Sequence, residues 1–303
     1  MTSNFPTIGC VILTYQGRAH LSRGLPPLLQ SPLKPRVLVV DSSSSDGTAD
    51  LARELGAEVL MIPSGEFNHG GTRELARRHL GTDIVVMLTQ DAYLVDEHAL
   101  GQLVAPLLNK QASIAYARQI PYPNASFFEA FPREFNYPEK SQLRGIEDLP
   151  HHGVYTFFCS NSCAAYKNSV LDEIGGFPRV LLGEDTVATA KILRKGYKIA
   201  YVAEAKALHS HCYSLKQEFC RHFDTGLART SYAKLLIGAG KDSKRGQEYV
   251  RFMIKKLIKT PHLLPYGFAH ILTKWLGYRL GVMSVKAPTW FKKMLSSQKY
   301  YWK

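Results

Sequence analysis

The sequence predicts an α/β protein with a mostly parallel central sheet, helices on both faces of that sheet, and a basic helical region at the C-terminus. Two observations predict the sheet. Short apolar segments alternate with helical segments over the first 90 residues, and these apolar segments end beside polar residues. A third observation, the concentration of positive charge in the last 63 residues, distinguishes the C-terminal region.

The expected strands are short, continuous apolar runs, which are typical of a parallel sheet buried on both faces. They cover residues 8–13, 36–40, 58–62 and 83–88, and the helices expected between them cover residues 21–29, 49–55 and 72–80. Further along, we expect helices over residues 171–176 and 186–194 and a strand over residues 198–202. Residues 116–152 are rich in proline and aromatic residues, which predicts a long functional loop.

Polar motifs occur at the carboxyl ends of three of these strands. They are Thr14-Tyr15, residues 41–46, and Gln90-Asp91. In open α/β sheets, ligands bind beyond the carboxyl ends of the strands. The three motifs therefore indicate one binding site at that edge of the sheet.

The composition excludes several classes of protein. A chain of 303 residues with 45% hydrophobic and 21% charged residues is neither disordered nor fibrous. No apolar run reaches the roughly 20 residues of a membrane-spanning helix, and residues 1–6 do not resemble the start of a secretory signal. Five cysteines without a CxxC motif fit a reducing cytosol better than a disulfide framework.

Familiar nucleotide-binding and hydrolase motifs are missing. The turn after the first strand reads TYQGR at residues 14–18, where a dinucleotide-binding protein has GxGxxG, and neither GxxxxGK[ST] nor GxSxG occurs. These absences argue against an NAD-binding protein, a P-loop protein and a serine hydrolase of the GxSxG type.

The polar residues that remain as candidates are Asp41, Asp91, the Glu184-Asp185 pair and the two histidines His209 and His211. Carboxylates together with histidine can bind a divalent cation, and Asp185 could act as a general base if it lies in a pocket. Each residue also has an ordinary interpretation. Asp41 could cap a turn, and His211 could be a surface or core histidine.

The last 63 residues carry 14 of the 38 lysines and arginines but only two acidic residues, so their net charge is +12 out of +13 for the chain. Apolar residues recur at helical spacing in residues 248–259 and 263–280, and aromatic residues lie beside lysines in residues 290–303. Basic amphipathic helices with tryptophan and tyrosine favour an anionic membrane surface. Packing of the apolar stripe on the main body is the alternative. Nucleic acid is disfavoured as a partner because no nucleic-acid-binding motif is present.

The motifs VILTY, VVDSSSSDGT, FNHGGTRELA, MLTQDA, SNSCAAY, GGFP, GEDT and HSHCYSLKQEF follow one another in this sequence. In number and order they resemble the inverting family 2 glycosyltransferases, and within these the bacterial rhamnosyltransferases. The resemblance covers roughly residues 5–230. It implies a GT-A fold, a nucleotide-sugar donor, and a divalent cation, Mg²⁺ or Mn²⁺, on the donor diphosphate. It also implies a catalytic domain at residues 1–238, with a nucleotide-binding half (1–115) and an acceptor-binding half (116–238), before the C-terminal region at 239–303.

The resemblance also implies roles for individual residues. Those expected to bind the nucleotide sugar are Thr14, Tyr15, Asp41, Ser43, Asn68, Arg73, Gln90 and Asn161. Asp91 would bind the metal together with His209, with His211 as the alternative ligand. Asp185 would be the catalytic base, and Glu184 would position the acceptor or the Asp185 loop. Thr89 stands where the family has the first acid of its Asp-x-Asp motif, so the cation has one carboxylate fewer.

We therefore expect an enzyme that transfers L-rhamnose from dTDP-β-L-rhamnose to a saccharide on polyprenyl diphosphate, for surface polysaccharide synthesis such as O-antigen. It would work in the cytoplasm, peripherally on the inner face of the bacterial plasma membrane. Two alternatives remain: the same fold with a UDP-hexose donor, and a non-catalytic nucleotide-sugar-binding protein.

Overall fold

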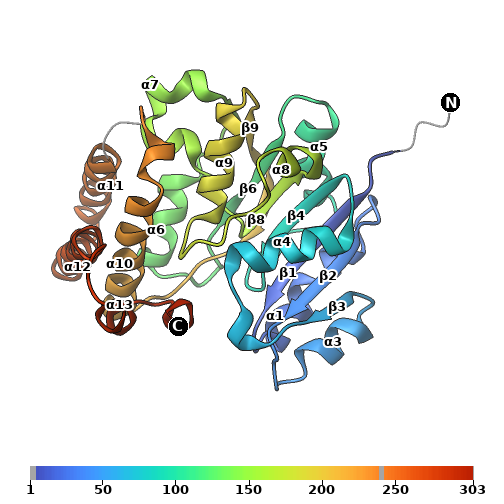
Figure 1. The fold of residues 1–303 in the computed structure, drawn as a ribbon. Helices are drawn as coiled ribbons and strands as arrows, with labels where there is room; N and C mark the ends of the chain where they lie inside the picture. Colours follow the sequence, from blue (N-terminus) through green and yellow to red (C-terminus); the bar gives the residue numbers. More distant parts are fainter. Residues whose placement is uncertain (1–4, 239–241, 303) are drawn as a thin grey trace.

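The computed structural model describes residues 5–238 and 242–302. Within them, nine strands form one sheet in the order β3-β2-β1-β4-β8-β6-β9-β5, with β7 paired to β9 (Figure 1). The strands are β1 (Ile8–Thr14), β2 (Arg36–Asp41), β3 (Glu58–Met61), β4 (Ile84–Thr89), β5 (Tyr93–Leu94), β6 (Ile114–Ile120), β7 (Gln142–Arg144), β8 (Cys163–Lys167) and β9 (Ile199–Leu208). The α/β class expected from the sequence is confirmed.

The four N-terminal strands pair in parallel, as their continuous apolar runs predict. Beyond β4 the sheet becomes mixed, because β8 runs antiparallel to both β4 and β6, and β5 and β7 run antiparallel to β9. The sheet as a whole is therefore mixed, whereas the sequence suggested a mostly parallel one.

Helices cover both faces of the sheet, since alternate residues of each strand contribute to a different core. Cys10 and Ile12 of β1 pack with α1, α2, α3 and α5, whereas Val11 and Leu13 pack with α4, α8 and α9. These helices are α1 (Arg18–Gly24), α2 (Pro26–Leu29), α3 (Thr48–Glu54), α4 (His69–Leu80), α5 (Ala99–Leu108), α8 (Asn168–Glu173) and α9 (Glu184–Arg194). The single helix expected over residues 21–29 is two helices, because Pro26 begins the second one.

The prediction of a long loop over residues 116–152 is wrong. This segment contains most of β6, then α6 (Phe127–Asn136), β7 and α7 (Leu149–His152). Helix α6 starts with a capping box between Ser126 and Glu129 and tolerates Pro132 in its interior. Its phenylalanines at 127, 131 and 135 follow helical spacing, a signal that the proline-rich composition concealed.

The C-terminal region packs against the body on the side away from β3 (Figure 1). It contains α11 (Asp242–Leu257), α12 (Leu264–Met283) and α13 (Thr289–Leu295), and it follows α10 (Leu215–Ser231). Met253 and Leu257 of α11 are buried with Phe131 of α6. The apolar stripe of α11 therefore packs on the body, the alternative left open by the sequence.

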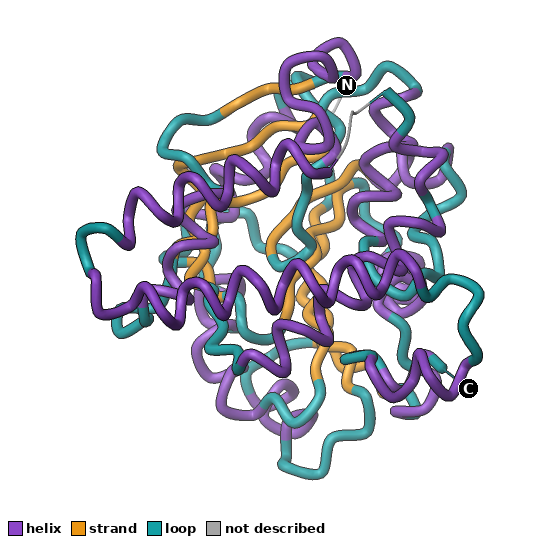
Figure 2. The backbone as a smooth tube through the Cα atoms, turned by 90° about the vertical axis from the view of Figure 1, so that its left-hand side faces the viewer, coloured by secondary structure: helices purple, strands orange, loops and turns teal. Residues whose placement is uncertain are grey.

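Helices α10 and α12 pack unusually closely because glycines line their contact. A Cβ atom at Gly226, Gly277 or Gly281 would overlap backbone atoms of the opposite helix. The other side of α12 carries exposed aromatic and aliphatic residues, among them Phe268 and Trp275. Figure 2 shows long helices lying in front of the sheet on this side of the molecule. None of the helices in the described part of the chain is long and apolar enough to cross a membrane.

Candidate active site

A pocket of about 620 Å³ lies between the sheet and helices α6, α9, α10 and α12. Its lining includes eight of the residues singled out from the sequence: Arg73, Thr89, Asp91, Asn161, Glu184, Asp185, His209 and His211. These residues come from five separate motifs that span 139 positions of the sequence, from 73 to 211. The fold therefore brings the predicted acidic and histidine motifs together in one cavity.

Asp91, His209 and His211 form one group that can hold a metal ion. Each offers a ligand atom, and the three atoms lie within 4.8 Å of one another. His209 Nε2 lies 3.5 Å from Asp91 Oδ1, and His211 Nδ1 lies 3.4 Å from Asp91 Oδ2. The pairing of β5 with the end of β9 brings these segments together, since Tyr93 lies opposite Leu208.

A further residue, Gln119 of β6, orients His209. Gln119 Nε2 donates a hydrogen bond to Ser160 Oγ at 2.8 Å, so its Oε1 is the atom that faces His209 Nδ1, also at 2.8 Å. Because an amide oxygen only accepts, Gln119 favours the tautomer of His209 with the proton on Nδ1, whereas Arg133 Nη2, 3.2 Å from the same nitrogen, can only donate and favours the other tautomer. In the tautomer that Gln119 favours, the lone pair of His209 is on Nε2, the atom that faces Asp91, as a metal ligand requires.

The charges in this group match that role. Burial raises the pKa of Asp91, but the hydrogen bond and charge that His209 supplies when it is protonated, with the charge of protonated His211, outweigh burial and hold the pKa well below its usual range. Burial lowers the pKa of His209, and burial followed by the proximity of His209 lowers the pKa of His211 to about 3. The carboxylate is therefore ionised and both imidazoles are neutral at pH 7, the protonation states that bind metals.

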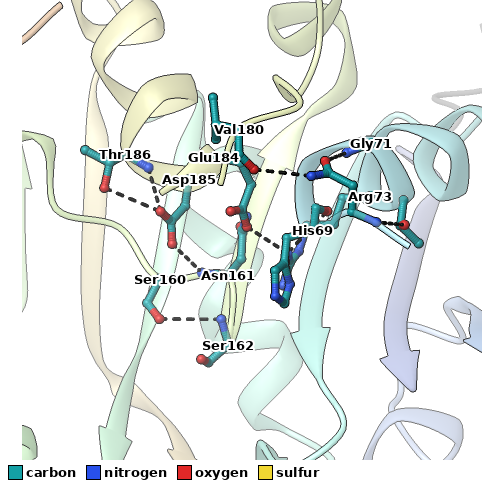
Figure 3. Close-up of polar contacts among 12 residues, drawn as sticks. His69, Gly71, Arg73, Ser160, Asn161, Ser162, Val180, Glu184, Asp185 and Thr186 are labelled. Atoms are coloured by element: carbon teal, nitrogen blue, oxygen red, sulfur yellow. Dashed lines mark hydrogen bonds and ion pairs between the residues drawn. The ribbon is translucent and has the colours of Figure 1, made fainter. Parts of the chain in front are cut away.

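A second group faces the same pocket from the start of α9 (Figure 3). Glu184 Oε1 accepts hydrogen bonds from Arg73 Nη1 at 2.7 Å and from Asn161 Nδ2 at 3.1 Å. The arginine and the glutamate are both buried. Gly70 makes this pair possible, because any Cβ there would overlap the carbonyl of Pro178 and push α4 away from α9.

Asp185 is the half-buried carboxyl of this group. Its Oδ1 accepts from the backbone N–H of Thr186 at 2.6 Å, and its Oδ2 accepts from the backbone N–H of Asn161 at 3.3 Å. Burial and then the negative charge of Glu184 raise the pKa of Asp185 from 3.8 to about 6. A carboxyl with a pKa near neutrality that is ionised at pH 7 is suited to accept a proton.

The expected nucleoside-binding residues lie at the edge of the sheet, outside the lining of this pocket. Thr14 and Asp41 are opposite each other at the ends of β1 and β2, and Thr14 Oγ1 donates to Asp41 Oδ1 at 3.0 Å. Ser44 adds two hydrogen bonds to the same carboxylate, from its backbone N–H at 2.8 Å and its hydroxyl at 2.6 Å. Ser43 takes a positive φ of 61°, and its hydroxyl donates to the carbonyl of Ile62.

Two more predicted residues hold loops in place. Gln90 Oε1 accepts from the backbone N–H of Tyr15 at 2.8 Å, and the Tyr15 side chain is exposed. Asn68 caps α4, accepting from Gly71 N at 2.9 Å and donating to the carbonyl of Val180. Both amides have partners within the protein, and their contact with a donor remains a prediction.

Comparisons with known proteins agree with this geometry. The family model for Glycosyl transferase family 2 matches residues 10–175. The chain belongs to this family. It is 36% identical over 300 residues to the O-antigen chain rhamnosyltransferase RfbN of Salmonella typhimurium, covering 97% of this chain and 96% of that one. It is 34% identical to the O-antigen chain rhamnosyltransferase WbaN of Salmonella anatum, covering 98% and 96%.

Among solved structures, this glycosyltransferase is similar to the mannosyltransferase PcManGT from Pyrobaculum calidifontis in complex with GDP-Man and Mn²⁺. The TM-score is 0.62 at 16% identity, over 94% of this chain and 87% of that one. The TarS structure from S. aureus with UDP-GlcNAc has a TM-score of 0.55 at 13% identity, over 92% and 91%. These similarities confirm the GT-A fold.

Several pocket residues of this glycosyltransferase were not identified from the sequence. They are Gln119, Arg133, Glu218, Arg221, Lys274 and Gln298. Glu218 and Arg221 lie on α10, within the HSHCYSLKQEF segment or directly after it. Lys274 and Gln298 come from the C-terminal region, which we expected to face a membrane. Their contribution to the pocket depends on packing between α10 and α12, for which the sequence carries no local signal.

Proposed function

We propose that this glycosyltransferase transfers L-rhamnose from dTDP-β-L-rhamnose, with inversion, to a saccharide carried on polyprenyl diphosphate in surface polysaccharide synthesis. Its similarity to two O-antigen chain rhamnosyltransferases over nearly the full chain supports the sugar and the pathway. The observation that carries the mechanism is that Asp185 and the Asp91–His209–His211 group line one pocket.

Asp185 would act as the general base. Its carboxylate takes the proton of an acceptor hydroxyl, the hydroxyl oxygen forms a bond to the anomeric carbon, and the bond from that carbon to the diphosphate oxygen breaks. The bonding electrons leave with dTDP. Attack on the face opposite the diphosphate inverts the configuration. Glu184 holds the negative charge that raises the pKa of Asp185, and its pairing with Arg73 fixes the start of α9.

The residues present fit a divalent cation. Asp91, His209 and His211 would hold it, and Gln119 would keep Nε2 of His209 directed toward it. When bound, such a cation supplies positive charge that stabilises the leaving diphosphate. Two imidazoles with a single carboxylate favour Mn²⁺ over Mg²⁺, which prefers oxygen ligands.

The donor nucleoside would bind at the carboxyl ends of β1 and β2. There Thr14 and Asp41 are held by hydrogen bonds, and the exposed ring of Tyr15 is free to contact a base. Arg133 and Arg221, which line the pocket close to the histidines, would add positive charge near the diphosphate.

The exposed face of the C-terminal helices would bind an anionic membrane surface, which would place the enzyme at the inner face of the plasma membrane. Phe268, Trp275 and Trp290 are 70%, 57% and 67% exposed. The same helices carry the exposed basic residues Arg279 and Lys293. Aromatic residues flanked by basic ones match the boundary between lipid headgroups and acyl chains.

The donor is tested by calorimetry with dTDP-rhamnose, UDP-glucose, UDP-galactose and UDP-N-acetylglucosamine, each with Mn²⁺, with Mg²⁺ and without metal. We expect dTDP-rhamnose to bind best and Mn²⁺ to tighten it. Tighter binding of a UDP-sugar would overturn the rhamnose assignment and favour a UDP-hexose transferase. Binding of a donor without any turnover would favour a non-catalytic nucleotide-sugar-binding protein.

The membrane surface is tested by sedimentation with vesicles of phosphatidylglycerol and phosphatidylcholine. Replacing Phe268, Trp275 and Trp290 together by serine should reduce binding, and so should raised salt. Replacing the exposed Tyr15, Met61 and Leu75, which lie on the nucleotide-binding half, provides the matched control. Deleting the whole region is less informative, because it would uncover the core around Phe131.

A further inference from the structure

The segment after α13 returns to the active site. We call residues 296–301 the C-terminal strap. Ser297 donates two hydrogen bonds to Asp224 Oδ2 of α10, from its backbone N–H at 2.8 Å and its hydroxyl at 2.6 Å. Further along, the ring of Tyr300 packs edge-on against Phe67, just before α4, with ring centroids 5.6 Å apart. The strap thus connects α10 to the nucleotide-binding half, and Figure 1 shows the C-terminus between them.

Between these two attachment points, Gln298 lines the active-site pocket. Its backbone N–H donates to Ser296 Oγ at 2.9 Å, which tightens the turn. Its Oε1 accepts from the hydroxyl of Tyr300, and its side chain lies near His69, which lines the same pocket. The carboxamide is therefore held at the wall of the cavity by Tyr300, while Ser296 fixes the backbone.

The surroundings of Gln298 belong to the side of the pocket that carries Asp185. His69 and Arg73 come from the first turns of α4, and Arg73 pairs with Glu184, the neighbour of Asp185. A carboxamide is uncharged and offers both a donor and an acceptor, as neutral sugar hydroxyls require. Phosphate oxygens, in contrast, are matched by cations.

We propose that the strap forms part of the acceptor-binding wall and that Gln298 contacts the acceptor saccharide. This inference rests on the proposed function, because it takes Asp185 as the base that faces the acceptor. The strap is attached to the body without a contribution from the Gln298 side chain. Ser297 and Tyr300 already hold the strap at its two ends.

The test compares Gln298→Ala with Lys299→Ala in the full chain. Lys299 is in the same strap, exposed, and outside the pocket lining. The probes are dTDP-rhamnose and a panel of single sugars (glucose, galactose, mannose and N-acetylglucosamine) on a synthetic phenoxyundecyl diphosphate. The acceptor that the wild-type enzyme uses best is then used to measure KM for both variants. The rate of donor hydrolysis is measured separately, in the absence of an acceptor.

We expect Gln298→Ala to raise KM for the acceptor about tenfold, which corresponds to one lost hydrogen bond. KM for dTDP-rhamnose and the rate of donor hydrolysis should stay within about twofold of wild type, and the thermal midpoint within about one degree. Lys299→Ala should change none of these quantities, nor KM for the acceptor. An unchanged acceptor KM, or a rise in donor KM instead, would overturn the proposal. A fall in thermal midpoint that accounts for the lost activity would also overturn it.

Truncation after Leu295 provides a second measurement. It removes the strap and leaves α12 and α13 in place, so we expect loss of transfer with unchanged vesicle binding. A truncated enzyme that transfers rhamnose as well as wild type would contradict the proposal.

If the wild-type enzyme transfers another sugar, the same comparison is made with that donor. A wild-type enzyme without any transfer would overturn the proposed function, and the strap proposal with it.

Discussion

Two aspartates face the same pocket, and their surroundings shift their acidity in opposite directions. The histidines beside Asp91 hold its pKa well below the usual range. Asp185 has Glu184 beside it, and burial together with that negative charge raises its pKa to about 6. One carboxylate is thus kept ionised, and the other is ready to exchange a proton.

One type of side chain thus serves two functions in one cavity. A carboxylate that stays ionised among neutral imidazoles is suited to hold a cation. A carboxylate whose ionised form is disfavoured takes up a proton readily. The chain achieves this by placing histidines beside one aspartate and a second acid beside the other.

The largest loss of activity is expected for Asp185→Asn. The amide cannot take a proton, so we expect kcat to fall by about 10³-fold, within the range of general-base contributions. Binding of dTDP-rhamnose should change little, since Asp185 would face the acceptor. Steady-state rates and calorimetry measure both quantities. Asp172→Asn, at an exposed carboxylate paired with Arg77, is the control. Turnover near the wild-type rate would remove Asp185 as the base.

The corresponding change in the metal group is Asp91→Asn. This change removes the only carboxylate among the three candidate ligands, so binding of Mn²⁺ should weaken by at least about tenfold. We expect transfer to fall by about 10²-fold and to recover partly at high Mn²⁺, a recovery that Asp185→Asn should not show. Titration of activity with Mn²⁺ separates the two variants. A loss insensitive to metal would contradict the assignment of this group.

The sequence predicted more of the nucleotide-binding half than of the rest. Thr14 and Asp41 end short apolar strands that pair in parallel, and this arrangement follows from hydropathy alone. The metal group was assigned by resemblance to a family. Its assembly depends on β5, a strand of two residues that no periodicity can reveal. Gln298 could not be predicted, because its place in the pocket results from the packing of α10 and α12 and from the hydrogen bonds between Ser297 and Asp224.

A smaller effect is expected for Gln119→Leu, which keeps the bulk of the side chain and removes its hydrogen bond to His209. The imidazole would then be free to turn or to change tautomer. Loss of such a supporting hydrogen bond lowers metal affinity about 10- to 100-fold. We expect Mn²⁺ binding to weaken while KM for the acceptor is unchanged. Calorimetry with Mn²⁺ measures the first and initial rates the second. Unchanged metal affinity would show that Gln119 does not orient His209.

The raised pKa of Asp185 also predicts how the rate of transfer depends on pH. Asp185 must be ionised to act as a base, so kcat/KM should be constant above its pKa of about 6 and fall about tenfold per pH unit below it.

The raised pKa of Asp185 also means that the folded state binds this proton more tightly than the unfolded state. Ionised Asp185 therefore costs stability at neutral pH, and that cost disappears as the pH falls from 6 through 3.8.

Glu184→Gln tests the cause of this shift. Removing the neighbouring negative charge should lower the pKa of Asp185, so the acid limb of the pH profile should move to lower pH. The same change leaves Arg73 buried without its partner, which should destabilise the fold by about 3 kcal/mol. The profile is therefore measured well below the thermal midpoint of the variant. An acid limb that stays near pH 6 would mean that burial alone raises the pKa of Asp185. The charge of Glu184 would then contribute nothing to the difference between the pKa values of Asp185 and Asp91.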